Sequence, residues 1–324
     1  YSDRKRAQQE DSYAYNSTLM CNSMRTETGF QCMRDITKAD WRNRSDGTLG
    51  GVFGESSRND TQFWYDGQTL RDDWKDNEEK YGINSAQYVM LKVPDEAMSA
   101  AVKFDYELTD DIQANFQVQY SENNSINDKS PEDEYEGAYA LTIDPITGAP
   151  GRVKPGYIPI DNPHVPDEIA NSGLYKDRIY WDRRFGEVGE IQTDNKRTTL
   201  RTWAGLQGTI FDGDWDWDLS AGYGRTTQDQ TRYNELNTFR VNSALQAEQL
   251  DDGTIQCIDE EARAAGCVPL NLFGEGSISP AAADYIRSNP TIETEIEQIN
   301  VLGYIAGDLF TMPAGPVATV FGVE

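Results

Sequence analysis

Alternating apolar and polar residues, in segments joined by turns of very unequal length, constrain the fold of this chain most strongly. From Val102 to Leu108 the apolar side chains occupy the even positions, and after Thr109-Asp110-Asp111 the segment from Ile112 to Tyr120 repeats the pattern. Period-two alternation is typical of a strand with one apolar and one polar face. We therefore predict a β-hairpin whose two strands share those two faces.

Two further hairpins follow the same plan. Leu200 to Ile210 is followed by Asp212-Gly213-Asp214 and then by Trp215 to Tyr223. The third hairpin begins near Glu297, turns at Met312-Pro313-Ala314-Gly315 and returns toward Val323. The apolar positions again alternate with polar ones, although less cleanly in the third hairpin.

The connections between the hairpins are long, running roughly from Asn123 to Asn195 and from Gln228 to Thr294. Such lengths are uncommon in compact soluble domains. Outer-membrane β-barrels, in contrast, combine short periplasmic turns with long extracellular loops. The asymmetry predicts that the turns at Asp110, Asp212 and Ala314 face the periplasm.

The amino-acid composition favours a protein that crosses a membrane with β-strands. Mean hydropathy is -0.70, yet aromatic residues make up 11% of the chain. A barrel needs apolar side chains on one face only, so it can be polar on average and rich in aromatics. No apolar run reaches the ~18 residues of a transmembrane helix, and the polar segment Tyr1 to Asn16 does not resemble a signal peptide. The net charge of -26 argues against nucleic acid as a partner.

The cysteines fall into two close pairs, Cys21 with Cys32 and Cys257 with Cys267. Pairing within each couple would close a short loop in an oxidising, extracytoplasmic compartment. The alternative is four free thiols, since neither pair has the two-residue spacing of a zinc or redox site. We predict two disulfides.

Aromatic residues in the long connections are candidates for substrate contact. They are Trp64, Tyr65, Trp74, Tyr157 and Trp181. Aromatic faces suit sugars, peptides or aromatic chelates equally well. Packing of the loops against one another is the alternative role.

Charged residues at the polar positions of the second hairpin are predicted to face the lumen of a barrel. They are Arg197, Arg201, Asp216 and Asp218. The arginines would attract an anionic ligand, or they would pair with the aspartates across the hairpin.

No catalytic residue, cofactor or metal site is predicted, and the chain is not expected to be an enzyme. The single histidine, His164, has no partner pattern, and no nucleophile elbow, phosphate-binding loop or zinc spacing occurs. Acidic runs such as Glu132-Asp133-Glu134 and Asp251-Asp252 would suit calcium bound between loops. A solvated surface is the simpler interpretation of these runs.

Several segments resemble TonB-dependent outer-membrane receptors of the proteobacterial type. In chain order they are Tyr106-Glu107-Leu108-Thr109-Asp110, Asn162-Pro163-His164-Val165-Pro166, Trp181-Asp182-Arg183-Arg184, Gly205-Leu206-Gln207-Gly208 with Trp215-Asp216-Trp217-Asp218, Cys257 with Cys267-Val268-Pro269-Leu270-Asn271-Leu272-Phe273-Gly274, and Gly307-Asp308-Leu309-Phe310 with Pro313-Ala314-Gly315-Pro316-Val317. The resemblance covers roughly residues 81 to 324. It implies an all-β fold, an antiparallel transmembrane barrel of about 22 strands. It also implies substrate binding outside the cell and release driven by TonB through a plug domain.

The sequence departs from that pattern at both ends. We find no plug domain or TonB box, and too few strands to close a barrel, so residues 1–324 are expected to be a fragment of the barrel wall and its loops. The expected function of the parent protein is TonB-dependent uptake of a scarce or bulky nutrient, such as a siderophore, oligosaccharide or peptide. Its location would be the outer membrane, with lipid and TonB as partners. The alternative is a secreted or surface-exposed acidic β-rich module for binding or adhesion.

Overall fold

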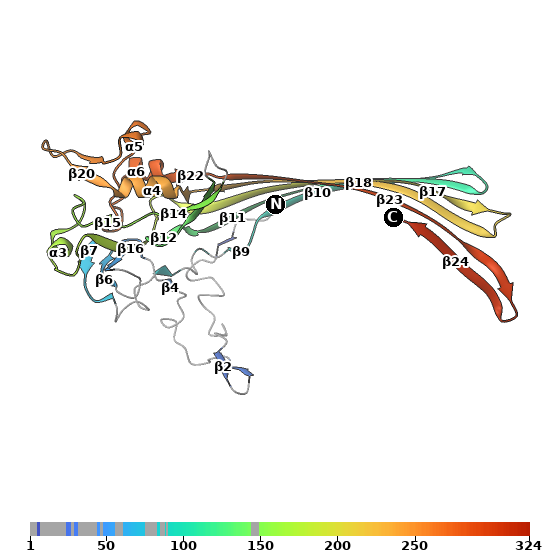
Figure 1. Cartoon of the computed structure of the whole chain (residues 1–324), viewed down its shortest axis with the longest axis horizontal. Coiled ribbons are helices and arrows are strands. Elements are labelled where there is room, and N and C mark those ends of the chain that lie inside the picture. Colours follow the sequence, from blue (N-terminus) through green and yellow to red (C-terminus); the bar gives the residue numbers. More distant parts are fainter. Residues whose placement is uncertain are drawn as a thin grey trace.

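A computed structural model describes residues 5–6, 24–26, 29–31, 44–45, 48–55, 61–74, 83–84, 88, 90–143 and 149–324. It consists mostly of antiparallel β-strands, which confirms the all-β prediction. One long sheet forms the greater part of the molecule, and a loop region with its own small sheets and short helices lies at one end of it (Figure 1). Among the described residues no helix is long and apolar enough to cross a membrane.

The long sheet has six strands in the order β10-β11-β17-β18-β23-β24, and every neighbouring pair is antiparallel. Their bounds are β10 (Asp95–Thr109), β11 (Ile112–Pro131), β17 (Glu190–Ile210), β18 (Trp215–Tyr233), β23 (Thr291–Met312) and β24 (Gly315–Val323). The three predicted hairpins are β10–β11, β17–β18 and β23–β24. The sheet is open, with β10 and β24 at its edges.

A short turn joins the two strands of each hairpin, at the end of the sheet away from the loop region, as predicted (Figure 1). In the turn between β17 and β18, Phe211 and Asp212 both have φ of 56° and Gly213 has φ of 93°. Left-handed turns of this kind match the right-handed twist of paired strands. The Asp-Gly sequence therefore fixes a tight turn at this position.

The strands are longer than predicted. β11 and β17 remain paired through Asp128 and Gln192, and β18 and β23 through Thr231 and Thr291. Each long connection is therefore shorter than predicted, because it begins a few residues later and ends a few residues earlier than the alternation indicated. Most residues of these extensions are polar, so alternation is lost while the backbone hydrogen bonds of the sheet continue.

The loop region contains a second sheet of order β12-β16-β5-β6-β7, with β15 paired to β16. Its strands are β12 (Asp133–Tyr135), β16 (Arg178–Arg184), β5 (Val52–Gly54), β6 (Thr61–Asp66), β7 (Thr69–Arg71) and β15 (Ile158–Pro159). Smaller pairs are β13 (Ala140–Ile143) with β14 (Pro150–Val153), β19 (Glu235–Leu236) with β22 (Arg287–Ser288), β20 (Ala247–Gln249) with β21 (Ile255–Cys257), β1 (Lys5–Arg6) with β9 (Met90–Lys92), β2 (Met24–Thr26) with β3 (Gly29–Gln31), and β4 (Arg44–Ser45) with β8 (Ile83–Asn84).

Among the described residues of the loop region there are four short helices, which the sequence pattern did not predict. They are α3 (Asp167–Ala170), α4 (Thr238–Leu245), α5 (Glu260–Ala264) and α6 (Pro280–Ile286). Asn237, Asp259 and Ser279 cap the last three by accepting a hydrogen bond from a backbone N–H. Helices this short are too brief to show helical periodicity, and the caps were the only local signal.

A buried apolar cluster holds the loop region together. Its members include Phe53, Ile158, Ile179, Trp181, Phe185, Val241, Leu245, Leu270, Leu272 and Ile286. These side chains come from segments separated by more than two hundred residues. The long connections are therefore a packed structure and not a set of independent solvated loops.

Candidate functional site

The register of the long sheet divides its side chains between two faces. Phe104, Phe116, Ala204, Ala221 and Val301 lie side by side on successive strands, one on each. We call their side the Phe116 face and the opposite side the Gln117 face. The alternation predicted within each hairpin thus continues, in phase, across all six strands.

The Phe116 face carries an apolar band that covers only the half of the sheet nearest the turns. On β18 the band runs from Trp215 to Tyr223, a length that matches the ~9–11 residues of a transmembrane strand. Its large side chains are exposed in this structure; Ile299 is 75% exposed and Val301 is 54% exposed. Trp215 and Trp217 mark the turn end of the band, and Tyr223 marks the other end.

Immediately beyond Tyr223 the same face becomes charged. The hydroxyl of Tyr223 donates a hydrogen bond to Glu297, and Arg225 forms an ion pair with Glu295 at 2.9 Å. On the neighbouring strands Lys196 pairs with Glu122 at 3.3 Å. At the end away from the turns, the band therefore has a sharp border, as expected where an apolar medium meets water.

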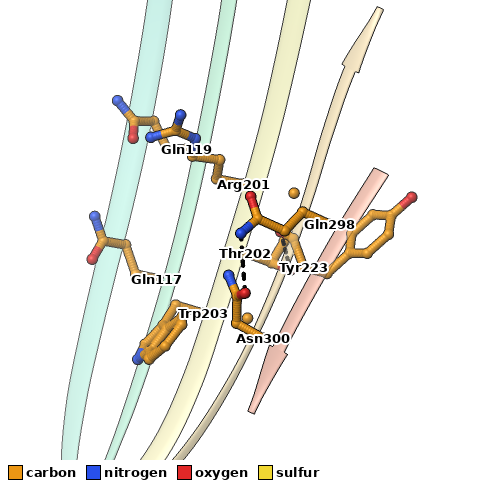
Figure 2. A pocket seen from close by; sticks show the side chains of 10 residues that line it. Gln117, Gln119, Arg201, Thr202, Trp203, Tyr223, Gln298 and Asn300 are labelled. Atoms are coloured by element: carbon orange, nitrogen blue, oxygen red, sulfur yellow. Dashed lines mark hydrogen bonds between the residues drawn. The ribbon is translucent and has the colours of Figure 1, made fainter. Parts of the chain in front are cut away.

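A hollow lies on the Gln117 face, at the level of this border (Figure 2). Two adjacent rows of the register build it. One row is Gln119, Arg201, Gly224 and Gln298, and the other is Gln117, Trp203, Gly222 and Asn300. Gly222 and Gly224 have no side chains, whereas the residues beside them on β17 and β23 have long ones. This difference leaves an open volume of about 450 Å³ above β18.

Trp203 is the one aromatic side chain that projects into the hollow (Figure 2). Its half-buried indole lies over Gly222, where an added β-carbon would come within 2.3 Å of Trp203 Cε3. Beside it the Gln298 amide donates a hydrogen bond of 3.0 Å to Asn300 Oδ1. Tyr223 lies apart from this group, in accordance with its place on the other face (Figure 2).

Acidic side chains are absent from this part of the Gln117 face. Beyond the two rows of the hollow come Ser121, Thr199, Thr226 and Ile296, and then Asn123, Arg197, Gln228 and Thr294. We call these four rows together the amide patch. The acids nearest to the patch on these strands lie on the opposite face, at Glu122, Asp194, Asp229, Glu293, Glu295 and Glu297.

The four charged residues predicted to face a lumen share the Gln117 face but not one site. Arg197 and Arg201 lie in the amide patch, and the Arg197 guanidinium donates to Gln228 Oε1 at 2.8 Å. Asp216 and Asp218 lie near the turns, opposite Thr209 and Gln207. The alternative that the arginines pair with these aspartates across the hairpin is wrong, because the register separates them.

Most of the predicted substrate-contacting aromatics are buried in the loop region, which corrects that expectation. Trp181 and Tyr65 belong to the main apolar cluster, and Trp64 and Trp74 form a second cluster with Val52. The reason is packing: each indole or phenol fills space between segments distant in sequence. Tyr157 alone is partly exposed, and Arg178 lies 4.1 Å from the centre of its ring.

Buried charges of the loop region serve its internal structure. The fully buried Arg183 guanidinium donates to the backbone oxygens of Leu49, Asn271 and Gly274 and to Glu187. Burial lowers the pKa of Arg183 to about 10, and the neighbouring Glu187 opposes that shift. The side chain is therefore still a cation at neutral pH.

The acidic runs proposed as calcium ligands do not converge on a metal site. Among the described residues no group of three or more His, Cys, Asp or Glu side chains has the geometry to hold a metal ion. Burial, followed by the charge of Glu132, raises the pKa of Glu134 to about 8. Asp133 instead forms an ion pair with Arg184 at 3.3 Å.

The disulfide predicted between Cys257 and Cys267 is present, with an S–S distance of 2.05 Å. It links the last residue of β21 to Cys267 and closes a loop that contains α5. The predicted partners Cys21 and Cys32 lie outside the described residues.

Comparisons with known proteins identify no family for this chain. No protein-family model matches the sequence, and a search of curated proteins finds no match. Among solved structures, the siderophore receptor PiuA from Acinetobacter baumannii is similar over 70% of this chain and 28% of its own, at 13% identity and a TM-score of 0.20. The chain thus spans less than a third of that receptor. A similarity this weak carries no argument about fold or function, which must come from the geometry above.

Proposed function

We propose that this chain is part of the wall and the extracellular loops of an outer-membrane receptor that takes up a scarce or bulky nutrient by TonB-dependent transport. The apolar band on the Phe116 face is the observation that carries the proposal. Its length on β18 suits a bilayer, its turn end is marked by tryptophans, and a charged zone begins where it stops.

Lipid is the medium that best accounts for the band. Leaving a large apolar side chain in water costs about 1.5–3 kcal/mol relative to burying it. Soluble monomers rarely expose contiguous apolar patches beyond a few hundred Å². Here six adjacent strands present such side chains together, among them Phe104, Phe116, Leu219, Val301 and Phe321.

In this proposal the short turns face the periplasm and the loop region faces the outside. The disulfide between Cys257 and Cys267 then lies in an oxidising environment, where it persists. The Gln117 face lines the lumen, and contact with TonB belongs to a plug domain. We propose binding and transport for this chain and assign it no catalytic step.

Fractionation of the native source tests the proposal. Outer-membrane fractions are run on a gel with and without boiling and probed with an antibody to residues 234–290. We expect a membrane-bound band that shifts on boiling and runs well above 36.4 kDa. A soluble, unshifted band would overturn the proposal and support the alternative of a secreted β-rich binding module.

A further inference from the structure

The amide patch differs in charge from the rest of the molecule. The whole chain carries a net charge of -26, yet the four rows hold no carboxylate and two arginines, Arg197 and Arg201. The facing positions on β10, which are Ala97, Ser99, Ala101 and Lys103, add no acid either. The acids of β18 that share the Gln117 face, Asp216 and Asp218, lie near the turns and outside the patch. The patch is therefore the part of the long sheet best suited to a negatively charged solute.

Neutral carboxamides dominate the lining of the hollow. Gln117, Gln119, Gln298 and Asn300 each offer both a donor and an acceptor. Hydroxyl groups have the same dual character, so a ring of carboxamides suits a ligand with many hydroxyls. A compact metal chelate would instead call for a cluster of cations.

Trp203 supplies the apolar element. Its indole lies against Gly222 and forms part of the lining of the hollow (Figure 2). An indole in this position provides a flat surface on which the C–H face of a sugar ring can stack. Same-face residues are ~6.8 Å apart along a strand and neighbouring strands are ~4.8 Å apart. The two rows of the hollow thus span roughly the area of a few sugar rings.

We propose that the amide patch binds an acidic oligosaccharide. Trp203 stacks on a sugar ring, the carboxamides hydrogen-bond its hydroxyls, and Arg201 pairs with its carboxylate or sulfate. Among the described residues Arg201 forms no ion pair that would compete with this role, whereas Arg225 on the other face is paired with Glu295. The inference deepens the proposed uptake function and rests on it, because uptake gives a solute access to this face.

Binding is measured by calorimetry on the purified full-length protein in detergent. The probes are acidic tetrasaccharides built from galacturonate, from mannuronate and from sulfated galactose, with cellotetraose as the neutral match. We expect at least one acidic probe to bind about tenfold or more tightly than cellotetraose. Arg201→Gln and Trp203→Leu should each weaken that binding by about tenfold or more.

Arg225→Gln is the matched control, since Arg225 lies one position from the Arg201 row but on the Phe116 face. It should leave binding unchanged, and the heat-dependent gel shift confirms that every variant is folded. Preference for cellotetraose, failure of all three acidic probes, or equal losses in the Arg201 and Arg225 variants would overturn the inference. Binding of a ferric tris-catecholate with the same dependence on Arg201 and Trp203 would also overturn it, by showing that charge alone suffices.

The outcome is separate from that of the fractionation test. A protein that fractionates with the outer membrane but binds no acidic probe loses only the ligand assignment. A protein that binds acidic tetrasaccharides through Arg201 but stays soluble keeps the binding face and loses the uptake function.

Discussion

The indole of Trp203 occupies the space that a side chain at Gly222 would need, and the two residues lie directly opposite each other on β17 and β18. Trp203 is also the one aromatic residue of β17 at a polar position of the alternation. The Trp203 indole covers the backbone of Gly222, and it also forms one edge of the hollow. Each residue therefore has a structural role that must be separated from binding.

Replacing Gly222 with alanine tests whether the indole of Trp203 packs against this position. Gly222→Ala should destabilise the protein by about 1–3 kcal/mol, because the new methyl group forces Trp203 to move. Gly224→Ala is the matched control, since its β-carbon would meet nothing nearer than Arg201 Cγ at 3.9 Å. The readout is the urea midpoint of unfolding in detergent micelles. Equal midpoints for the two variants would contradict the close packing.

Adjacent residues on β23 test the assignment of the faces. Val301→Arg places a charge in the apolar band and should cost about 2–4 kcal/mol in a bilayer. Leu302→Arg places the same charge on the Gln117 face and should be tolerated. Insertion into lipid vesicles is followed by the heat-dependent gel shift. If Leu302→Arg blocked insertion and Val301→Arg did not, the faces would be assigned the wrong way round.

The buried cation of the loop region should be indispensable to it. Arg183→Met removes the donors to Leu49, Asn271 and Gly274 and leaves Glu187 without its cation, at a cost of about 3–5 kcal/mol. Limited proteolysis of the loop region reports the loss as faster cleavage. Arg178→Met is the control, because Arg178 is exposed and its guanidinium lies over the ring of Tyr157. Similar cleavage rates would show that the network is dispensable.

Stability of the loop region should depend on the protonation of Glu134. Its folded-state pKa is raised to about 8 from the ordinary value of 4.5, so the folded form holds the proton more strongly than the unfolded chain. The contribution of Glu134 to stability is therefore fully present below about pH 4.5 and is lost as pH rises toward 8. Glu134→Gln should flatten this part of the pH profile, measured by hydrogen exchange of residues 133–135 and 182–184. An unchanged slope in the variant would exclude Glu134 as the titrating group.

Reduction of the disulfide should loosen one segment and leave the rest intact. A cross-link with a sequence separation of 10 restricts the unfolded chain by ~2–3 kcal/mol. Cys257→Ser together with Cys267→Ser should therefore raise hydrogen exchange in β20, β21 and α5. The long sheet should be unaffected, because these elements do not pair with it. Loss of the heat-dependent gel shift in the double variant would instead show that the disulfide supports the whole fold.

The alternation along each strand was enough to predict the three hairpins, their turns and their two faces. A period of two places each side chain on one side or the other, whatever the strand later pairs with. The sequence analysis failed where this local signal ends. It stopped the strands at Asn123 and Gln228, although hydrogen bonding carries β11 to Pro131 and β18 to Tyr233 through mostly polar segments.

The candidate site required the tertiary structure, because its residues come from four strands whose register no single segment specifies. Gln117, Trp203, Gly222 and Asn300 form one row only when β11, β17, β18 and β23 are aligned. The same holds for Trp64 and Trp181, whose indoles are placed by neighbours far away in the chain. The sequence by itself determined which face of a strand is apolar, since that depends on neighbours along the chain. Which side chains meet across the sheet depends on pairing and packing, and these only the folded structure decides.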